Sequence, residues 1–137
     1  MSDVTINGVE VFREGTWRDH DYTGYDLTSM AVGYKFLIRE VPVTVSHGGP
    51  AVGNVKEIRR EGDRLVADLV VGEETAERIR AGDLHSVSVN LVFDCGCVVN
   101  EIALLGEGEH PYCEGLAPLR KAMRPKLGPG GSPLKRK

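Results

Sequence analysis

Short runs of alternating apolar and polar residues fill most of the chain between Val41 and Gly106. A period of two is typical of strands that bury one face against a core. The turn residues Glu61–Arg64 and the segment 94–97 separate neighbouring runs. The pattern therefore predicts a strand in each of the following ranges: 41–46, 53–60, 64–72, 84–93 and 98–106.

Two segments have a helical pattern instead. Residues 73–82 begin with acidic residues, continue with good helix formers and two arginines, and end at Gly82. Acidic residues at the start and basic residues at the end complement the helix dipole, and glycine commonly ends a helix. Residues 27–37 place apolar side chains at helical spacing, and Asp26 is a suitable N-cap. We therefore expect two short helices.

The N-terminal part of the chain combines an alternating segment with a polar one. Residues 4–12 alternate around Asn7-Gly8, a strong hairpin signal, so we expect a strand pair there. The polar, glycine-containing stretch 13–26 is expected to be a loop. With 137 residues, one domain is the natural size. The predicted fold class is α+β, with a small, mainly antiparallel β-barrel-like core and two short helices.

Charge divides the chain into an acidic body and a basic end. The formal net charge of −3 splits into −10 for residues 1–115 and +7 for residues 116–137, which hold seven Lys or Arg and no acid. Proline and glycine in the second segment oppose regular structure, so we expect a flexible, basic tail over 116–137. Such a tail suits contact with nucleic acid or an acidic protein surface, or it serves as a solubilising segment.

Several classes of protein are disfavoured. No apolar run approaches the length needed to cross a bilayer, and the first residues lack the pattern of a secretion signal, so cytoplasmic synthesis without membrane attachment is expected. Cys95, Cys97 and Cys113 do not form a disulfide framework or a four-cysteine zinc site and are expected to be free thiols. The sequence has no phosphate-binding glycine motif, and we expect no cofactor.

His47 is a lone imidazole at the end of a predicted strand, directly before two glycines and a proline. If the turn at 94–97 sets Phe93 opposite Val98, Ser88 lies opposite Ala103. Glu101 then shares the face of Ser88 at a diagonal separation of roughly 7–8 Å, which leaves room for an imidazole between them. This geometry is compatible with a serine nucleophile, a histidine base and an orienting carboxylate.

Structural roles remain an alternative for each of these residues, because serines, glutamates and single histidines are common on strands. Ser86 is expected to point away from Ser88 and to be structural. His85 and His110 are alternative third members of the site, although surface positions are the better explanation for both.

The order of three segments (47–71, 77–93 and 101–111) resembles the phage prohead, or head maturation, serine proteases, which are related to the herpesvirus assemblin fold. The opening VEVFREGTW is also similar to that of family members related to protease-scaffold proteins. The resemblance implies that Ser88 is the nucleophile, His47 the base and Glu101 the third member.

The resemblance also implies a function: an endopeptidase that cleaves scaffold segments, capsid protein tails and often itself inside the prohead, in the host cytoplasm. Its expected partners are the major capsid protein and a scaffold segment, and assemblin relatives work as dimers. Two alternatives stay open. One is a catalytically inactive capsid protein on the same fold, and the other is a small nucleic-acid binder that acts through residues 116–137.

Overall fold

The computed structural model describes residues 3–33, 35, 40–47, 49–93, 97–113 and 115–123. These residues form eight strands and three helices, in the order β1 (Asp3–Arg13), β2 (Gly15–Trp17), β3 (His20–Tyr22), α1 (Gly24–Gly33), β4 (Pro42–Val45), β5 (Gly53–Glu61), β6 (Arg64–Gly72), α2 (Glu73–Arg80), β7 (Ser86–Phe93), β8 (Cys97–Leu105) and α3 (Leu119–Ala122).

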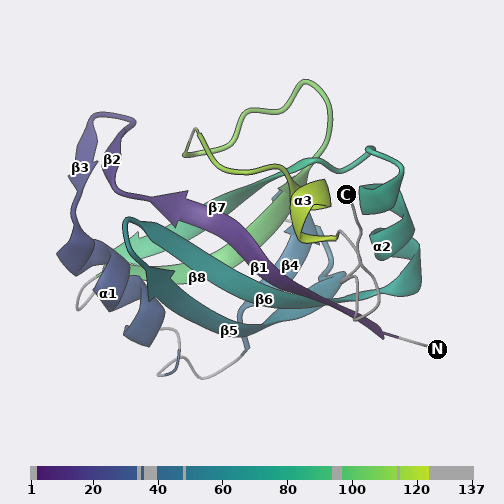
Figure 1. Ribbon diagram of the computed structural model, residues 1–137, viewed down its shortest axis with the longest axis horizontal. Coiled ribbons are helices and arrows are strands. Elements are labelled where there is room, and N and C mark those ends of the chain that lie inside the picture. The colour runs from purple at the N-terminus through teal and green to yellow at the C-terminus, as the bar shows by residue number, and fades with distance from the viewer. Residues whose placement is uncertain are drawn as a thin grey trace, which may run out of the picture.

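Six of the strands form one curled sheet in the order β1-β6-β5-β4-β8-β7 (Figure 1). Within the described residues, neighbouring strands of this sheet run antiparallel except β4 and β8, which run parallel. The curl brings the two edge strands, β1 and β7, into contact. The predicted class, α+β with a mainly antiparallel, barrel-like core, is therefore confirmed, and a third short helix is added to the two that were predicted.

The hairpin of β5 and β6 follows the sequence pattern closely. Glu61 pairs with Arg64 across a two-residue turn, as predicted. Val55 and Ile58 both point inward although they are three residues apart, because a bulge between Val55 and Glu57 changes the parity of the strand.

The predicted hairpin around Asn7-Gly8 is wrong, because β1 is one continuous strand that pairs with β6 along its length. Its register shifts between Ile6 and Val9, and Gly8 takes a left-handed conformation (φ +76°). The N–H group of Gly8 donates to the carboxylate of Asp68 at 2.9 Å. The Asn7-Gly8 pair therefore forms part of a β-bulge. Like a tight hairpin turn, the bulge requires a residue that can adopt a left-handed backbone conformation.

The predicted loop over residues 13–26 is also partly wrong, because it contains the small hairpin of β2 and β3. Trp17 pairs with His20, and the two residues between them, Arg18 and Asp19, both have positive φ (52° and 66°). Two successive left-handed residues make the type of turn that matches the strand twist of a tight hairpin.

The two predicted helices are present with altered ends. Helix α2 occupies Glu73–Arg80, as expected. Helix α1 begins at Gly24, before the predicted start, and the carboxylate of Asp26 accepts a hydrogen bond from the N–H group of Thr23. Asp26 thus binds back to the residue before the helix from within its first turn, in the manner of a capping box. The predicted end of this helix, at residues 36 and 37, lies outside the described residues.

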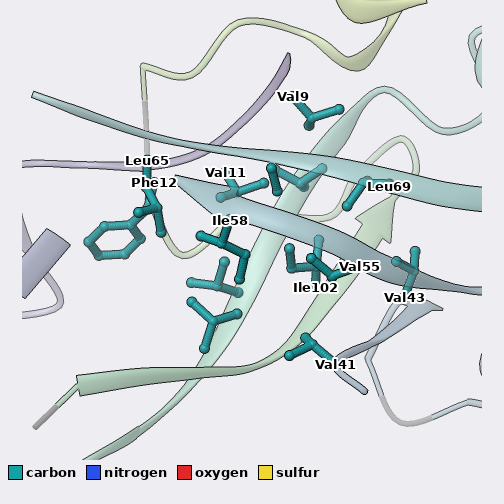
Figure 2. Close-up of a cluster of buried hydrophobic side chains, with 14 of the residues drawn as sticks. Val9, Val11, Phe12, Val41, Val43, Val55, Ile58, Leu65, Leu69 and Ile102 are labelled. Atoms are coloured by element: carbon teal, nitrogen blue, oxygen red, sulfur yellow. The ribbon is translucent and has the colours of Figure 1, made fainter. Parts of the chain in front are cut away.

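The core lies inside the curl of the sheet and beneath the helices. Figure 2 shows part of it, where valines of several strands pack around Phe12, Ile58, Leu65, Leu69 and Ile102. These large side chains are at most 2% exposed. Burial of this apolar surface is the main force that holds the strands of the sheet together.

The packed body extends past the boundary predicted at residue 115. Leu119, in α3, is 1% exposed, and the N–H group of Ala117 donates to the carboxylate of Glu10 on β1. Residues 115–123 thus belong to the body rather than to a flexible tail, because their apolar side chains reach the core. The rest of the predicted tail, residues 124–137, lies outside the described residues.

Candidate active site

Three neighbouring strands bring the predicted site residues together. His47 lies two residues after β4, Glu101 lies in β8 and Ser88 lies in β7, and these strands are adjacent in the sheet. The pairing aligns Thr44 with Ala103, and Ala103 with Ser88. Paired residues project from the same face, so the small Ala103 stands between two hydroxyl side chains.

The register of the β7–β8 hairpin was predicted correctly near the site but not near the turn. Ser88 lies opposite Ala103, as expected, whereas Phe93 lies opposite Cys97 instead of Val98. A register shift between Asn90 and Leu91 accounts for the difference of one residue. The turn itself, residues 94–96, lies outside the described residues.

Buried polar groups are concentrated at this site. Four polar or charged residues are buried in the described part of the chain, and three of them are Thr44, Ser88 and Glu101. Burial of a hydroxyl or carboxylate costs free energy unless it is hydrogen-bonded, so a cluster of such groups requires an organised network.

His47 lies in a strained turn that directs its ring toward this cluster. Ser46 and His47 both have left-handed backbone conformations, with φ of 60° and 63°. Such conformations cost a non-glycine residue free energy of order 1–3 kcal/mol and are frequent at functional sites. The Nδ1 atom of His47 lies 3.0 Å from Oε1 of Glu101, and the His47 side chain is 39% exposed.

Glu101 is held at both carboxylate oxygens. Oε1 faces His47, and Oε2 accepts a hydrogen bond of 2.6 Å from the hydroxyl group of Thr44. The Glu101 side chain is 11% exposed. A carboxylate in this position favours the imidazole tautomer with a proton on Nδ1, which leaves Nε2 free to accept one.

Ser88 is 4% exposed, and its Oγ atom accepts a hydrogen bond of 2.9 Å from the N–H group of Tyr112. No hydrogen bond joins Ser88 to His47 within the residues that the structure describes. Because the hydroxyl oxygen accepts from Tyr112, the proton of the hydroxyl remains available for donation to a base.

A cleft of about 540 Å³ opens onto the site. His47, Ser88 and Glu101 all line it, and Arg18, His110 and Tyr112 contribute further polar groups. A cleft of this size is in the usual range for sites that bind a small molecule or part of a peptide.

Tyr112 is fixed by aromatic neighbours. Its hydroxyl lies 2.6 Å from that of Tyr22, its ring stacks on Phe12 and the guanidinium of Arg18 lies 4.7 Å from its ring centre. Burial, followed by the hydrogen bond with Tyr112, raises the pKa of Tyr22 above its usual value, so the Tyr22 hydroxyl stays protonated at neutral pH. These contacts hold the backbone of Tyr112 beside Ser88.

A second carboxylate lies near the turn that carries His47. The pKa of Glu109 is lowered, first by a hydrogen bond from the Ser46 side chain and then by the N–H group of Gly106, which lies 2.7 Å from Oε1. The loop after β8 is thereby connected to the residue next to His47. The same loop supplies Tyr112, so it contacts both sides of the site.

Within the described residues, no hydrogen bond joins the other candidates, Ser86, His85 and His110, to His47. The prediction that Ser86 points away from Ser88 is wrong, because residues two apart on a strand share a face. The Oγ atom of Ser86 is nevertheless buried without a hydrogen-bond partner among the described residues. Glu101, rather than His85 or His110, contacts the His47 ring.

The two cysteines that the structure describes do not line the cleft. Cys97 and Cys113 are both buried, and burial raises the pKa of Cys97 to about 12. Cys95 lies outside the described residues. Within the described ranges, no group of three or more His, Cys, Asp or Glu side chains is arranged to hold a metal ion.

Comparison with known proteins gives no relative: no family model, curated protein or solved structure matches the chain. Across the described residues, no helix is both long and apolar enough to cross a membrane.

Sequence reasoning missed two residues of this network, Thr44 and Tyr112. The alternating pattern over residues 41–46 predicts that Thr44 lies on the polar face of its strand, but β4 lies inside the sheet, and Val43 and Thr44 are both buried. A hydroxyl residue within a run of valines was the available signal. Tyr112 contributes a backbone group from a loop, for which the sequence carries no local signal.

Proposed function

We propose that this protein is a serine endopeptidase in which Ser88 is the nucleophile, His47 the general base and Glu101 the group that orients His47. The main support is the cluster of buried polar groups: Ser88 and Glu101 are buried on adjacent strands, and the His47 ring is paired with Glu101 in the same cleft. A buried carboxylate and serine serve no packing purpose that apolar residues would not fulfil better.

In the proposed reaction, Nε2 of His47 accepts the Ser88 proton as Oγ attacks the scissile carbonyl carbon. Glu101 stabilises the imidazolium that forms, through the proton on Nδ1. His47 then gives its proton to the leaving amine as the peptide C–N bond breaks, which leaves an acyl group on Ser88. A water molecule, deprotonated by His47, hydrolyses this ester and restores the serine.

The biological setting follows from the resemblance of the sequence to phage head maturation proteases. We propose that the substrates are scaffold segments, capsid protein segments and the enzyme's own chain, and that the enzyme acts inside the prohead in the host cytoplasm. Its partners in this proposal are the major capsid protein, a scaffold segment and a second copy of the chain. The remaining residues of the predicted tail, 124–137, are proposed to contact nucleic acid or an acidic protein surface.

One observation favours a second function, that of an inactive, protease-like capsid protein. Ser88 is almost fully buried, and its hydroxyl is bonded to Tyr112 rather than to His47. We favour the enzyme because hydrogen bonds of catalytic groups are often absent before substrate binds. The partly exposed side chain of His47 also lines the same cleft as Ser88.

Co-expression with the capsid protein precursor of the same genome tests the proposal. Wild type is expected to shorten the precursor or itself, and Ser88→Ala is expected to leave both chains intact, as measured by mass spectrometry of the intact proteins. Ser86→Ala is the matched control, because it removes a hydroxyl from the same strand and is expected to retain cleavage.

Two results would contradict the assignment. Truncation by the Ser88→Ala variant would show that another group is the nucleophile. Unchanged masses with wild type, under conditions in which proheads assemble, would favour the inactive capsid protein.

A further inference from the structure

We propose that Thr44 is a positioning residue of this site, which holds the Glu101 carboxylate in the orientation that pairs it with His47. This inference rests on the proposed function, since the reaction it supports is the proposed proteolysis. Neither the strand pattern nor the resemblance assigns a role to Thr44.

The contact is short and buried. The hydroxyl group of Thr44 lies 2.6 Å from Oε2 of Glu101, and Thr44 is 3% exposed. An ionised carboxylate only accepts hydrogen bonds, so Thr44 is the donor. Hydrogen bonds to a charged group are stronger than neutral ones, and screening by water is weak at a buried position.

The sheet fixes both ends of this contact. β4 runs parallel to β8, with Val43, Thr44 and Val45 opposite Ile102, Ala103 and Leu104. Glu101 comes two residues before Ala103, on the same face as Thr44. Two paired backbones therefore hold the donor and the acceptor, and the carboxylate has little freedom to rotate.

A hydroxyl is not needed here for packing. The flanking strand residues are valines, and valine has the same β-branched shape as threonine, with a methyl group in place of the hydroxyl. In a buried strand the hydroxyl costs desolvation free energy unless it makes a hydrogen bond. The presence of threonine is explained by what its hydroxyl binds, which is Glu101.

The expected consequence concerns the chemical step rather than substrate binding. Thr44 is absent from the lining of the cleft and so does not meet the substrate. Without its hydrogen bond, Oε2 of Glu101 remains buried with one partner fewer, and the carboxylate is free to turn away from His47. The proton on Nδ1 then has no fixed acceptor, and the ring loses its catalytic orientation.

The test compares Thr44→Val, which removes the hydroxyl at constant shape, with Thr44→Ser, which keeps it. Thr44→Val is expected to lower kcat by about tenfold to a hundredfold, the effect of one hydrogen bond to a charged group, with KM unchanged. Thr44→Ser is expected to restore most of the activity. Melting temperatures of both variants are measured to confirm that they remain folded.

A second readout does not depend on activity. In protein with ¹⁵N-labelled histidine, the Nδ1–H resonance of His47 is expected to move or broaden in Thr44→Val and to return in Thr44→Ser. If wild type cleaves nothing, the proposed function fails, whereas this resonance still tests the link from Thr44 through Glu101 to His47.

The inference is overturned if Thr44→Val leaves both kcat and the His47 resonance as in wild type. Equal losses in the valine and serine variants would also overturn it, because the serine variant retains the hydroxyl. A rise in KM alone would place Thr44 in substrate binding and would contradict the positioning role.

Discussion

A Glu101→Gln variant is expected to lose about four orders of magnitude in kcat while remaining folded, as when the carboxylate of a serine protease triad becomes an amide. The reason lies in the hydrogen bonds of Glu101. The Thr44 hydroxyl donates to one carboxylate oxygen and His47 faces the other. In the variant, a Thr44 hydroxyl that keeps its role as donor binds the amide oxygen, and the amide NH₂ group is then left facing His47. That group donates to Nδ1, so the ring proton moves to Nε2 and His47 no longer accepts the proton of Ser88.

The loss in Glu101→Gln is measured as the rate of precursor cleavage relative to wild type, followed by intact mass over time. Glu107→Gln is the matched control, because Glu107 is an exposed residue of the loop after β8. The control is expected to cleave at the wild-type rate. A cleavage rate for Glu101→Gln within about tenfold of wild type would contradict the role of Glu101, since that is far less than loss of the correct tautomer costs.

Phe12→Ala is expected to have the largest effect on stability, a loss of about 3–5 kcal/mol in the free energy of unfolding. Phe12 is 0% exposed and contacts Tyr22 edge-on, with ring centres 4.9 Å apart. Its ring also stacks on Tyr112. Removing the ring deletes buried apolar surface and leaves a cavity between β1 and the loop after β8.

The change in stability is measured by urea unfolding monitored by circular dichroism. Phe93→Ala makes the same substitution at a position that is 58% exposed, so the control is expected to lose at most about 1 kcal/mol. Similar losses in the two variants would show that Phe12 is not part of a well-packed core.

Local patterns predicted the middle of the chain best. The strands over residues 53–72 and helix α2 were predicted from alternation, turn residues and end charges, all of which act between neighbours in the sequence. The Gly62-Asp63 turn also set the register of its hairpin, because a two-residue turn leaves one pairing of the flanking strands.

Secondary structure was predicted wrongly where a sequence pattern is compatible with two different structures. Asn7-Gly8 permits a left-handed backbone, which both a hairpin turn and a bulge require, and only pairing with the distant β6 selects the bulge. The β2–β3 hairpin was missed because its strands have three residues each and its turn uses Arg18 and Asp19 in place of glycine.

The sequence predicted the part of the candidate site that lies on the β7–β8 hairpin. Ser88 and Glu101 share a face because of the β7–β8 register, which the sequence indicates. The placement of Thr44 depends on β4 pairing in parallel with β8, across more than fifty residues of chain. Tyr112 reaches Ser88 from a loop, so no periodicity predicts that contact.

The most direct test of the central claim is to label the protein with a fluorophosphonate, which forms a bond from phosphorus to an activated serine oxygen with loss of fluoride. Peptide mass spectrometry then locates the adduct, and no natural substrate is needed. We predict an adduct on Ser88 in wild type that is lost in His47→Ala and strongly reduced in Glu101→Gln. An unlabelled Ser88, or labelling that persists without His47, would contradict a catalytic site formed by these residues.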